Sequence, residues 1–188
     1  MDQRQTASTE SWRATKHLFC LLAASVVALA GCTKSASKEE GAAEPTPSLS
    51  APAQAAPAWE LRSVEGRLVK STEFQGKVVI LDFWATWCPP CRKEIPGFVE
   101  LQKEYRDKGL VVVGVSLDEG SPEAVKAFIG QFGINYPIVM GTPEVVAAFG
   151  GVEGIPTTFI LDRQGNIAGK HVGYAPKSDF ENTIKKLL

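Results

Sequence analysis

This sequence of 188 residues contains few cysteines and histidines, four and two respectively, and their scarcity excludes several kinds of protein. A small secreted domain built on disulfide bonds would show several spaced cysteine pairs, whereas only Cys88 and Cys91 lie close together here. A structural zinc site needs about four ligands. Outside the first 32 residues the chain offers only these two thiols and His171, so we expect no metal. Copper held by two thiols and one histidine is an open alternative.

An excess of charge of one sign is also lacking. The chain has 20 Lys and Arg against 21 Asp and Glu, a formal net charge of -1, and no basic stripe. We therefore expect no nucleic-acid partner. Long hydrophobic runs are missing as well, because the predominantly apolar stretch 18–30 is shorter than the roughly 20 residues that a membrane-spanning helix needs.

The N-terminal residues have the layout of an export signal. Three basic residues precede the apolar stretch 18–30, which ends in small residues. The sequence Leu29-Ala30-Gly31-Cys32 resembles the lipobox of bacterial lipoproteins, in which the cysteine is acylated and becomes the first residue. We predict that residues 1–31 are a lipoprotein signal peptide and that Cys32 is the lipidation site. An ordinary signal peptide with an incidental cysteine is the alternative.

Residues 32–58 are predicted to be a lipid-anchored, flexible linker. From position 33 the composition shifts to Ala, Ser, Pro, Glu and Lys, with too few large apolar groups to offset the entropy of ordering. A linker of about 25 residues has a root-mean-square reach of roughly 25–30 Å. We expect an extracytoplasmic protein of the periplasm, anchored to a bacterial membrane, with one folded domain at 59–188.

Hydrophobic periodicity predicts an α/β fold for residues 59–188. The continuous apolar runs 78–83 and 110–115 are typical of strands buried on both faces. Between them, apolar residues recur at spacings of three and four, which indicates a helix packed on one face: Ile95, Phe98, Leu101 and Tyr105. Strand, helix and strand together predict a βαβ unit.

Turn and cap signals predict the remaining elements. They are an N-terminal hairpin around Glu65-Gly66, helices that begin at Ser121-Pro122-Glu123 and Thr142-Pro143-Glu144, and a hairpin formed by 157–161 and 167–172. Ser178 and Glu181 are spaced as a capping box, which predicts the start of a last helix.

The two cysteines of the domain stand where a buried strand gives way to a helix, in Cys88-Pro89-Pro90-Cys91. Cysteines three apart at a helix start can close a small disulfide loop. Unpaired N–H groups and the helix dipole stabilise a thiolate there, so we expect a Cys88 pKa below the usual value of about 8.5. The prolines lack N–H groups and stiffen the loop. The pattern predicts a redox-active pair with Cys88 as the nucleophile, and no cofactor beyond that disulfide.

The segment Leu81–Cys91, LDFWATWCPPC, resembles the active-site segment of the TlpA/ResA-like branch of the thioredoxin superfamily. The likeness extends from about Trp59 to the C-terminus. Pro96 matches the proline of the active-site helix, Gly154-Ile155-Pro156-Thr157 matches the cis-proline loop, and the segment 120–150 matches an insertion of this branch. The resemblance implies a thioredoxin fold: a central mixed β-sheet flanked by helices, with an N-terminal β-hairpin and a TlpA-type central insertion.

The resemblance also implies roles around the disulfide. Pro156 is expected to be cis and to leave the backbone of Ile155 free to pair with an extended substrate segment. Trp87, Pro89 and Pro90 are expected to complete the substrate-binding surface. An ordinary turn before a strand is the alternative for residues 155–156.

Two acidic residues are candidate proton acceptors. Asp82 lies within an apolar strand, where a buried carboxylate is costly unless its protonation state is useful. In thioredoxin a buried aspartate at the matching position helps to deprotonate the second cysteine, so the resemblance assigns Asp82 to Cys91. Glu119 is assigned an accessory role as a glutamate of the inserted region. The alternatives are a hydrogen-bonded structural acid for Asp82 and an exposed loop charge for Glu119.

The function predicted from these features is thiol-disulfide oxidoreduction, most simply a reductant of disulfides in exported proteins. The resemblance implies apocytochrome c as one substrate, a membrane thiol protein as electron donor, and a monomer. A disulfide oxidase or isomerase and a copper-binding chaperone are the alternatives. A peroxidase of the peroxiredoxin type is not expected, because Ala85 and Leu81 occupy the positions of its threonine and proline.

Overall fold

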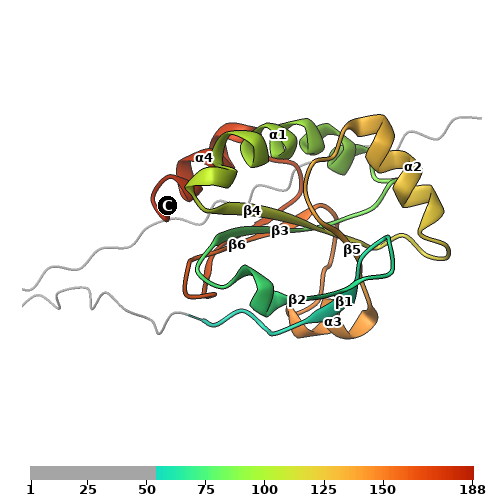
Figure 1. Ribbon diagram of the computed structural model, residues 1–188, viewed down its shortest axis with the longest axis horizontal. Coiled ribbons are helices and arrows are strands. Elements are labelled where there is room, and N and C mark those ends of the chain that lie inside the picture. The colour runs from blue at the N-terminus through green and yellow to red at the C-terminus, as the bar shows by residue number, and fades with distance from the viewer. Residues whose placement is uncertain (1–53) are drawn as a thin grey trace, which may run out of the picture. The chain divides into compact units, whose positions relative to one another are not determined.

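A five-stranded mixed sheet forms the centre of the computed structural model, which describes residues 54–188 (Figure 1). The strand order is β5-β4-β3-β6-β7. The pairs β3–β4 and β4–β5 are parallel, and the pairs β3–β6 and β6–β7 are antiparallel. The strands are β3 (Val78–Trp84), β4 (Leu110–Ser116), β5 (Ile138–Met140), β6 (Thr157–Leu161) and β7 (Ile167–Val172).

The predicted βαβ unit is β3, helix α1 (Pro89–Tyr105) and β4. Every residue of β3 is buried, as a strand covered on both faces requires. The four apolar residues that predicted the helix are all buried. Pro96 lies inside α1. A short 3₁₀ turn, η2 (Arg106–Lys108), follows, and Gly109 takes the left-handed conformation (φ 102°) that ends the turn before β4.

Helices and a small hairpin cover the two faces of the sheet (Figure 1). On one face lie α1, α2 and α4, and on the other lie α3, the hairpin and the turn η1. The hairpin pairs β1 with β2 in antiparallel register, as predicted. The bounds are β1 (Glu60–Arg62), β2 (Leu68–Lys70), η1 (Ser71–Phe74), α2 (Glu123–Phe132), α3 (Pro143–Ala148) and α4 (Lys177–Ile184). The fold is therefore the predicted thioredoxin fold.

Each face of the sheet has its own apolar core. The core on the α1 side contains Trp84, Phe98 and Phe180 together with both cysteines. The core on the hairpin side contains Trp59 and Phe83 among others. The disulfide thus belongs to the core shared by β3, α1 and α4, and only its edge can meet solvent.

Packing begins before Trp59, where the sequence alone places the start of the domain. Ala55 forms a bridge with Asn166, and the Ala56 N–H donates to the carbonyl of Gly165 at 2.9 Å. The Ile167 N–H donates to the carbonyl of Gln54 at 2.8 Å. These backbone bonds need no large apolar side chain, which is why composition did not indicate them.

The predicted start of the last helix is wrong. Helix α4 begins at Lys177 after Pro176, and no side chain caps it. Ser178 lies inside the first turn and donates to Asp179 at 3.2 Å, while Glu181 pairs with Lys185 at 2.9 Å. The N–H of Ala175, two residues before the helix, donates instead to a buried carboxylate of α1.

The other two predicted helix starts differ in detail. At α3, Thr142 caps the helix as predicted by accepting from the Val145 N–H at 3.4 Å. At α2 the helix begins at Glu123, and Pro122 takes the cap position, one residue later than the sequence indicates.

The predicted signal peptide, the lipidation site Cys32 and the linker up to residue 53 lie outside the described residues. Within residues 54–188, no helix combines the length and apolar character that crossing a membrane requires.

Candidate active site

Cys88 and Cys91 form a disulfide at the start of α1. The S–S distance is 2.05 Å and the Cα atoms are 5.3 Å apart. Cys88 is the N-cap residue with an extended backbone (φ -90°, ψ 107°), and its Sγ accepts a hydrogen bond from the Cys91 N–H at 3.2 Å. Pro89 and Pro90 occupy the first helical positions, where a missing N–H costs little. The sulfur of Cys88 therefore lies where helix N–H groups stabilise negative charge.

The loop with Pro156 lies against this disulfide. The Ile155–Pro156 peptide bond is cis, as the resemblance implies. The carbonyl oxygen of Ile155 is 3.6 Å from Cys88 Sγ. Among the backbone hydrogen bonds of residues 54–188, none has the Ile155 N–H as donor. The fold thus brings Cys88, Ile155 and Pro156 together and leaves a backbone donor beside the sulfur.

Three large apolar side chains are exposed around the disulfide. We call Trp87, Val172 and Tyr174 the apolar rim; they are 65%, 57% and 41% exposed. Trp87 precedes Cys88, and the Gly173 N–H donates to the carbonyl of Pro156 at 2.8 Å, which holds the other two beside the cis-proline loop. Exposed apolar patches of this kind mark binding surfaces. Trp84, by contrast, is a core residue that packs on Phe128 with ring centroids 5.3 Å apart.

Asp82 is buried in the middle of β3. It is 3% exposed, and its Oδ1 accepts a hydrogen bond from the Thr158 hydroxyl at 3.0 Å. Burial and the charge of Glu94 raise the Asp82 pKa well above its ordinary value, and the Thr158 bond opposes this only in part. The carboxyl group of Asp82 is therefore biased toward its neutral, protonated form.

Glu94 is a second buried acid, which our sequence analysis missed. It lies on α1 three residues after Cys91 and is 4% exposed. Oε1 accepts the Ala175 N–H at 2.6 Å, whereas Oε2 is buried with no hydrogen-bond partner among the described residues. Burial raises the Glu94 pKa to about 7. A carboxyl with this pKa can take up or release a proton near neutral pH.

The sequence contained a signal for Glu94. It stands one residue before Ile95 and four before Phe98, on the face of the helix that the apolar spacing points into the core. A charged residue on a buried face is the kind of exception that marks a functional group. The inserted region adds Tyr136, whose pKa is raised well above its ordinary value by burial and by the charges of Asp82 and Glu94.

The structure does not place Glu119 with these acids. Glu119 is exposed in the loop after β4, and no hydrogen bond of its side chain is found within residues 54–188. Its neighbour Asp118 turns inward instead and accepts from the N–H of Thr86 at 3.0 Å and from the Ser116 hydroxyl at 2.8 Å. The exposed position of Glu119 agrees with the alternative of an exposed loop charge, and its accessory role stays a prediction.

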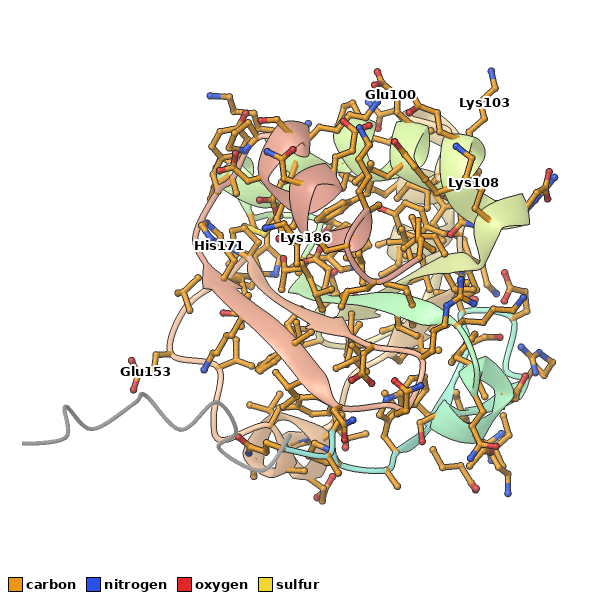
Figure 2. The ribbon with its side chains drawn as sticks, turned by 90° about the vertical axis from the view of Figure 1, so that its left-hand side faces the viewer. Glu100, Lys103, Lys108, Glu153, His171 and Lys186 are labelled. Carbon is orange, nitrogen blue, oxygen red and sulfur yellow. A yellow bond between two sulfur atoms is a disulfide. The ribbon has the colours of Figure 1, made fainter. Side chains whose placement is uncertain are left out.

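The part of the chain that the structure describes contains no group of three His, Cys, Asp or Glu side chains that could hold a metal ion. His171, which the copper alternative needs, lies on β7 beside α4 (Figure 2). Its ring contacts Phe180 edge-on with a centroid distance of 6.0 Å. The described residues thus offer two sulfurs and no third ligand gathered with them.

Comparisons with known proteins agree with this geometry. Residues 52–170 match the AhpC/TSA family. Thioredoxin-like protein YneN of Bacillus subtilis is 39% identical over 132 residues, which cover 70% of this chain and 77% of YneN. Thiol-disulfide oxidoreductase ResA of Bacillus anthracis is 33% identical over 132 residues, covering 70% and 76%.

A solved structure gives the same result. The crystal structure of a thiol:disulfide interchange protein of the thioredoxin family from Chlorobium tepidum is similar with a TM-score of 0.68 and 40% sequence identity. The match covers 73% of this chain and 98% of that chain. The residues matched to the AhpC/TSA family include the disulfide, both buried acids and the cis-proline.

Proposed function

This chain belongs to the AhpC/TSA family and is a thioredoxin-fold thiol-disulfide oxidoreductase, and from that premise we propose that it reduces disulfides in exported proteins. The observation that carries the proposal is the position of Cys88. Its sulfur caps α1, accepts from the Cys91 N–H and lies 3.6 Å from the Ile155 carbonyl. A thiolate there is stabilised and stands beside a free backbone donor.

The first step is attack by Cys88. In the reduced protein, the Cys88 thiolate attacks one sulfur of a substrate disulfide, so that the substrate S–S bond breaks and a mixed disulfide forms. The other substrate sulfur leaves as a thiolate and takes up a proton. The N–H groups at the start of α1 hold the attacking charge in place until the bond forms.

The second step is attack by Cys91 on the sulfur of Cys88. The Cys91 thiol must first lose a proton to a buried carboxylate. Glu94, with a pKa of about 7, is partly ionised near neutral pH and is the first candidate acceptor. Asp82 is the second candidate and can accept only in its ionised form, which its raised pKa disfavours. The mixed disulfide then breaks, the Cys88–Cys91 bond forms, and the second substrate sulfur leaves as a thiolate that is protonated. Two electrons have passed from the dithiol to the substrate.

The cycle closes when another dithiol reduces the Cys88–Cys91 bond. That donor becomes oxidised to a disulfide, so its two electrons balance those given to the substrate. We propose a membrane thiol protein in this role, since a protein outside the cytoplasm lies apart from the cytoplasmic thiol pool.

The proposed substrate is an unfolded, exported protein with a close cysteine pair, apocytochrome c being one example. An extended segment can pair with the free Ile155 N–H while its apolar side chains contact Trp87 and the rest of the apolar rim. Pro89 and Pro90 border the same surface. Specificity then depends on the sequence beside the substrate cysteine.

The test is a trapping experiment. Cys91→Ser removes the group that resolves the mixed disulfide, so it should accumulate covalent complexes through Cys88. These complexes should disappear on adding a reductant and should be absent from Cys88→Ser, which is the matched control. Mass spectrometry of the trapped proteins would then identify the substrates. A Cys91→Ser protein that traps nothing from its own compartment contradicts the proposed cycle.

The reduction potential of the Cys88–Cys91 pair tests the direction of electron flow. Reductases, isomerases and oxidases share this chemistry and differ in reduction potential, for which about 30 mV corresponds to 1.4 kcal/mol. Equilibration of the Cys88–Cys91 pair with glutathione buffers should give a potential near the reducing thioredoxins, about -270 mV. A value close to -120 mV would make the protein an oxidant instead.

Location is a separate part of the proposal. The lipobox-like sequence Leu29–Cys32 supports anchoring by lipid on the outer side of a bacterial membrane. Cys32→Ala should move the protein from the membrane fraction to the soluble fraction. Metabolic labelling with a fatty acid should be lost in the same variant, and a membrane-bound, unlabelled Cys32→Ala protein contradicts the anchor.

A further inference from the structure

Asp118 joins the end of β4 to the loop that leads into the active-site helix. The N–H of Thr86 donates to its Oδ2 at 3.0 Å, and the Thr86 hydroxyl donates to its Oδ1. The Ser116 hydroxyl donates to Oδ2 at 2.8 Å, and the N–H of Asp118 itself donates to Ser116 Oγ at 3.2 Å. One carboxylate thus receives three donors, two of them from Thr86.

Thr86 lies two residues before the nucleophile, inside a short and tightly held segment. The Cys88 N–H donates to the carbonyl of Ala85 at 3.2 Å, which closes a turn around Thr86. The Leu117 N–H donates to the carbonyl of Trp84 at 2.8 Å, so the strand end is held as well. The bonds to Asp118 therefore hold Thr86, the residue in the middle of this turn.

The conformation of Cys88 depends on that turn. Its cap geometry places Sγ 3.2 Å from the Cys91 N–H, and a shift of the preceding residues would move the sulfur away from the helix N–H groups. Hydrogen bonds to a charged group are stronger than those between neutral groups. Two such bonds from Thr86 to one carboxylate favour a single loop conformation over its alternatives.

We propose that Asp118 is a positioning residue for the nucleophile: through Thr86, it holds Cys88 in the cap conformation in which its thiolate is reactive. Asp118 touches neither the sulfurs nor the apolar rim. The inference rests on the proposed function only in taking Cys88 as the attacking thiol. A carboxylate near a thiolate also repels it, so positioning must outweigh this repulsion, and the charge of Arg92, the residue after Cys91, acts in the opposite sense.

The experiment uses the Cys91→Ser protein as parent, so that Cys88 is the reacting thiol. The probe is 5,5′-dithiobis(2-nitrobenzoate), whose reaction is followed by absorbance over a range of pH. Asp118→Ala removes the acceptor of both Thr86 bonds and should slow the reaction about tenfold at neutral pH. Thr86→Val removes only the hydroxyl bond and keeps the backbone N–H bond, so it should slow the reaction by a smaller factor, about fivefold. Asp118→Asn and Thr86→Ser keep an acceptor and a hydroxyl, and each should stay within about twofold of the parent.

The controls separate positioning from stability. Asp107→Ala removes an exposed aspartate of η2, whose one ion pair within residues 54–188 is with Arg106, and should react like the parent. The double variant Asp118→Ala/Thr86→Val should be no slower than Asp118→Ala alone, because Asp118→Ala already removes the hydroxyl bond that Thr86→Val removes. Melting temperatures are recorded in parallel. If Asp118→Ala does not fold, the reaction rates of Thr86→Val and Thr86→Ser are compared instead, and a slower Thr86→Val supports the inference.

Two results would overturn the inference. The first is a connection-removing variant that melts at a lower temperature but reacts at the parent rate, which would make the contact purely structural. The second is a faster Asp118→Ala, which would mean that charge repulsion dominates. A parent that reacts no faster than free cysteine would instead overturn the proposed function, so the two failures are distinguishable.

Discussion

Glu94 on the active-site helix accepts a hydrogen bond of 2.6 Å from the backbone N–H of Ala175, and this contact satisfies one of its two carboxyl oxygens. The other oxygen, Oε2, is buried and has no hydrogen-bond partner among the described residues. A neutral carboxylic acid tolerates such a place better than a carboxylate does. The geometry explains why a glutamate three residues from a redox-active cysteine carries a pKa of about 7.

The stability of the oxidised protein should fall as the pH rises from about 4.5 to 7. Burial raises the Glu94 pKa from 4.5 to about 7, so the folded state holds a proton that the unfolded state has lost. The penalty is absent below the lower pKa and complete above the higher one, at about 3 kcal/mol. Urea unfolding across this range measures it. Glu94→Gln should flatten the profile, and an unchanged slope would contradict the assignment.

Glu94→Gln should slow the resolving step. Glutamine keeps an acceptor for the Ala175 N–H but cannot take a proton from Cys91. We expect that release of a thiol from a mixed disulfide at Cys88 slows about tenfold and loses its pH dependence near 7. Stopped-flow measurement of that release is the assay. Glu119→Gln, at the exposed site that the sequence suggested, should have the smaller effect, and the reverse order would restore the sequence-based assignment.

Asp82→Asn should stabilise the oxidised protein. The Asp82 pKa is raised mainly by burial, so near neutral pH the native state holds a proton at a free-energy cost that the unfolded state avoids. Asparagine keeps an acceptor for Thr158 and removes that cost, so the free energy of unfolding at pH 7 should rise. Denaturation midpoints under oxidising conditions provide the measurement. A loss of stability would show that the neutral carboxyl makes bonds that the amide cannot.

Arg163 should matter for stability although it is far from the disulfide along the chain. Its guanidinium donates to three carbonyl oxygens, those of Gly76, Lys108 and Leu188, at 3.1, 3.2 and 2.6 Å. Arg163→Ala should lower the free energy of unfolding by about 2–3 kcal/mol. Arg163→Lys should recover less than half, since an ammonium lacks the planar fork.

The matched control for Arg163 is Arg106→Ala. Arg106 is exposed and forms an ion pair only with its exposed neighbour Asp107, at 3.2 Å. Such surface pairs contribute about 0–1 kcal/mol. If the two variants lose the same free energy of unfolding in urea titrations, the three carbonyl contacts of Arg163 do not add to stability.

Gly114→Ala should destabilise the sheet beside Asp82, which is its partner in the β3–β4 register. An added Cβ would lie 2.5 Å from Ile138 Cδ1 and 2.8 Å from Trp84 Nε1. Overpacking of this kind costs about 1–3 kcal/mol. Gly130→Ala on α2 has nothing within 4 Å of the new methyl group and should be neutral or stabilising. The difference between the two variants in thermal melts tests the packing argument.

The sequence was sufficient for features that depend on neighbours along the chain. The β3–α1–β4 unit follows from apolar runs and helical spacing, and the cap position of Cys88 follows from cysteines and prolines at a strand–helix boundary. Both features are determined by residues that lie close together in the sequence. The resemblance implied a central mixed sheet but the sequence did not provide the order of its five strands, because pairing between β3 and β6 joins segments far apart in sequence.

Features that depend on tertiary contacts could not be predicted from the sequence. Helix α4 begins after Pro176 and not at the capping signal of Ser178, and just before it Ala175 bonds to Glu94, 81 positions away in the sequence. Asp118 and Glu119 are adjacent acids after a strand, and only the position of Thr86, 32 residues earlier, decides which one turns inward. No local pattern carries that information.

The pairing of residues 54–56 with 165–167 has a practical consequence. These contacts lie beside the turn between β6 and β7, whereas Pro156 and the disulfide lie at the other end of β6. A purification handle, a fluorophore or a solid support attached upstream of Gln54 would therefore lie away from the end of the sheet at which partners approach the disulfide. Immobilised protein prepared in this way is a natural bait for capturing thiol partners directly from extracts.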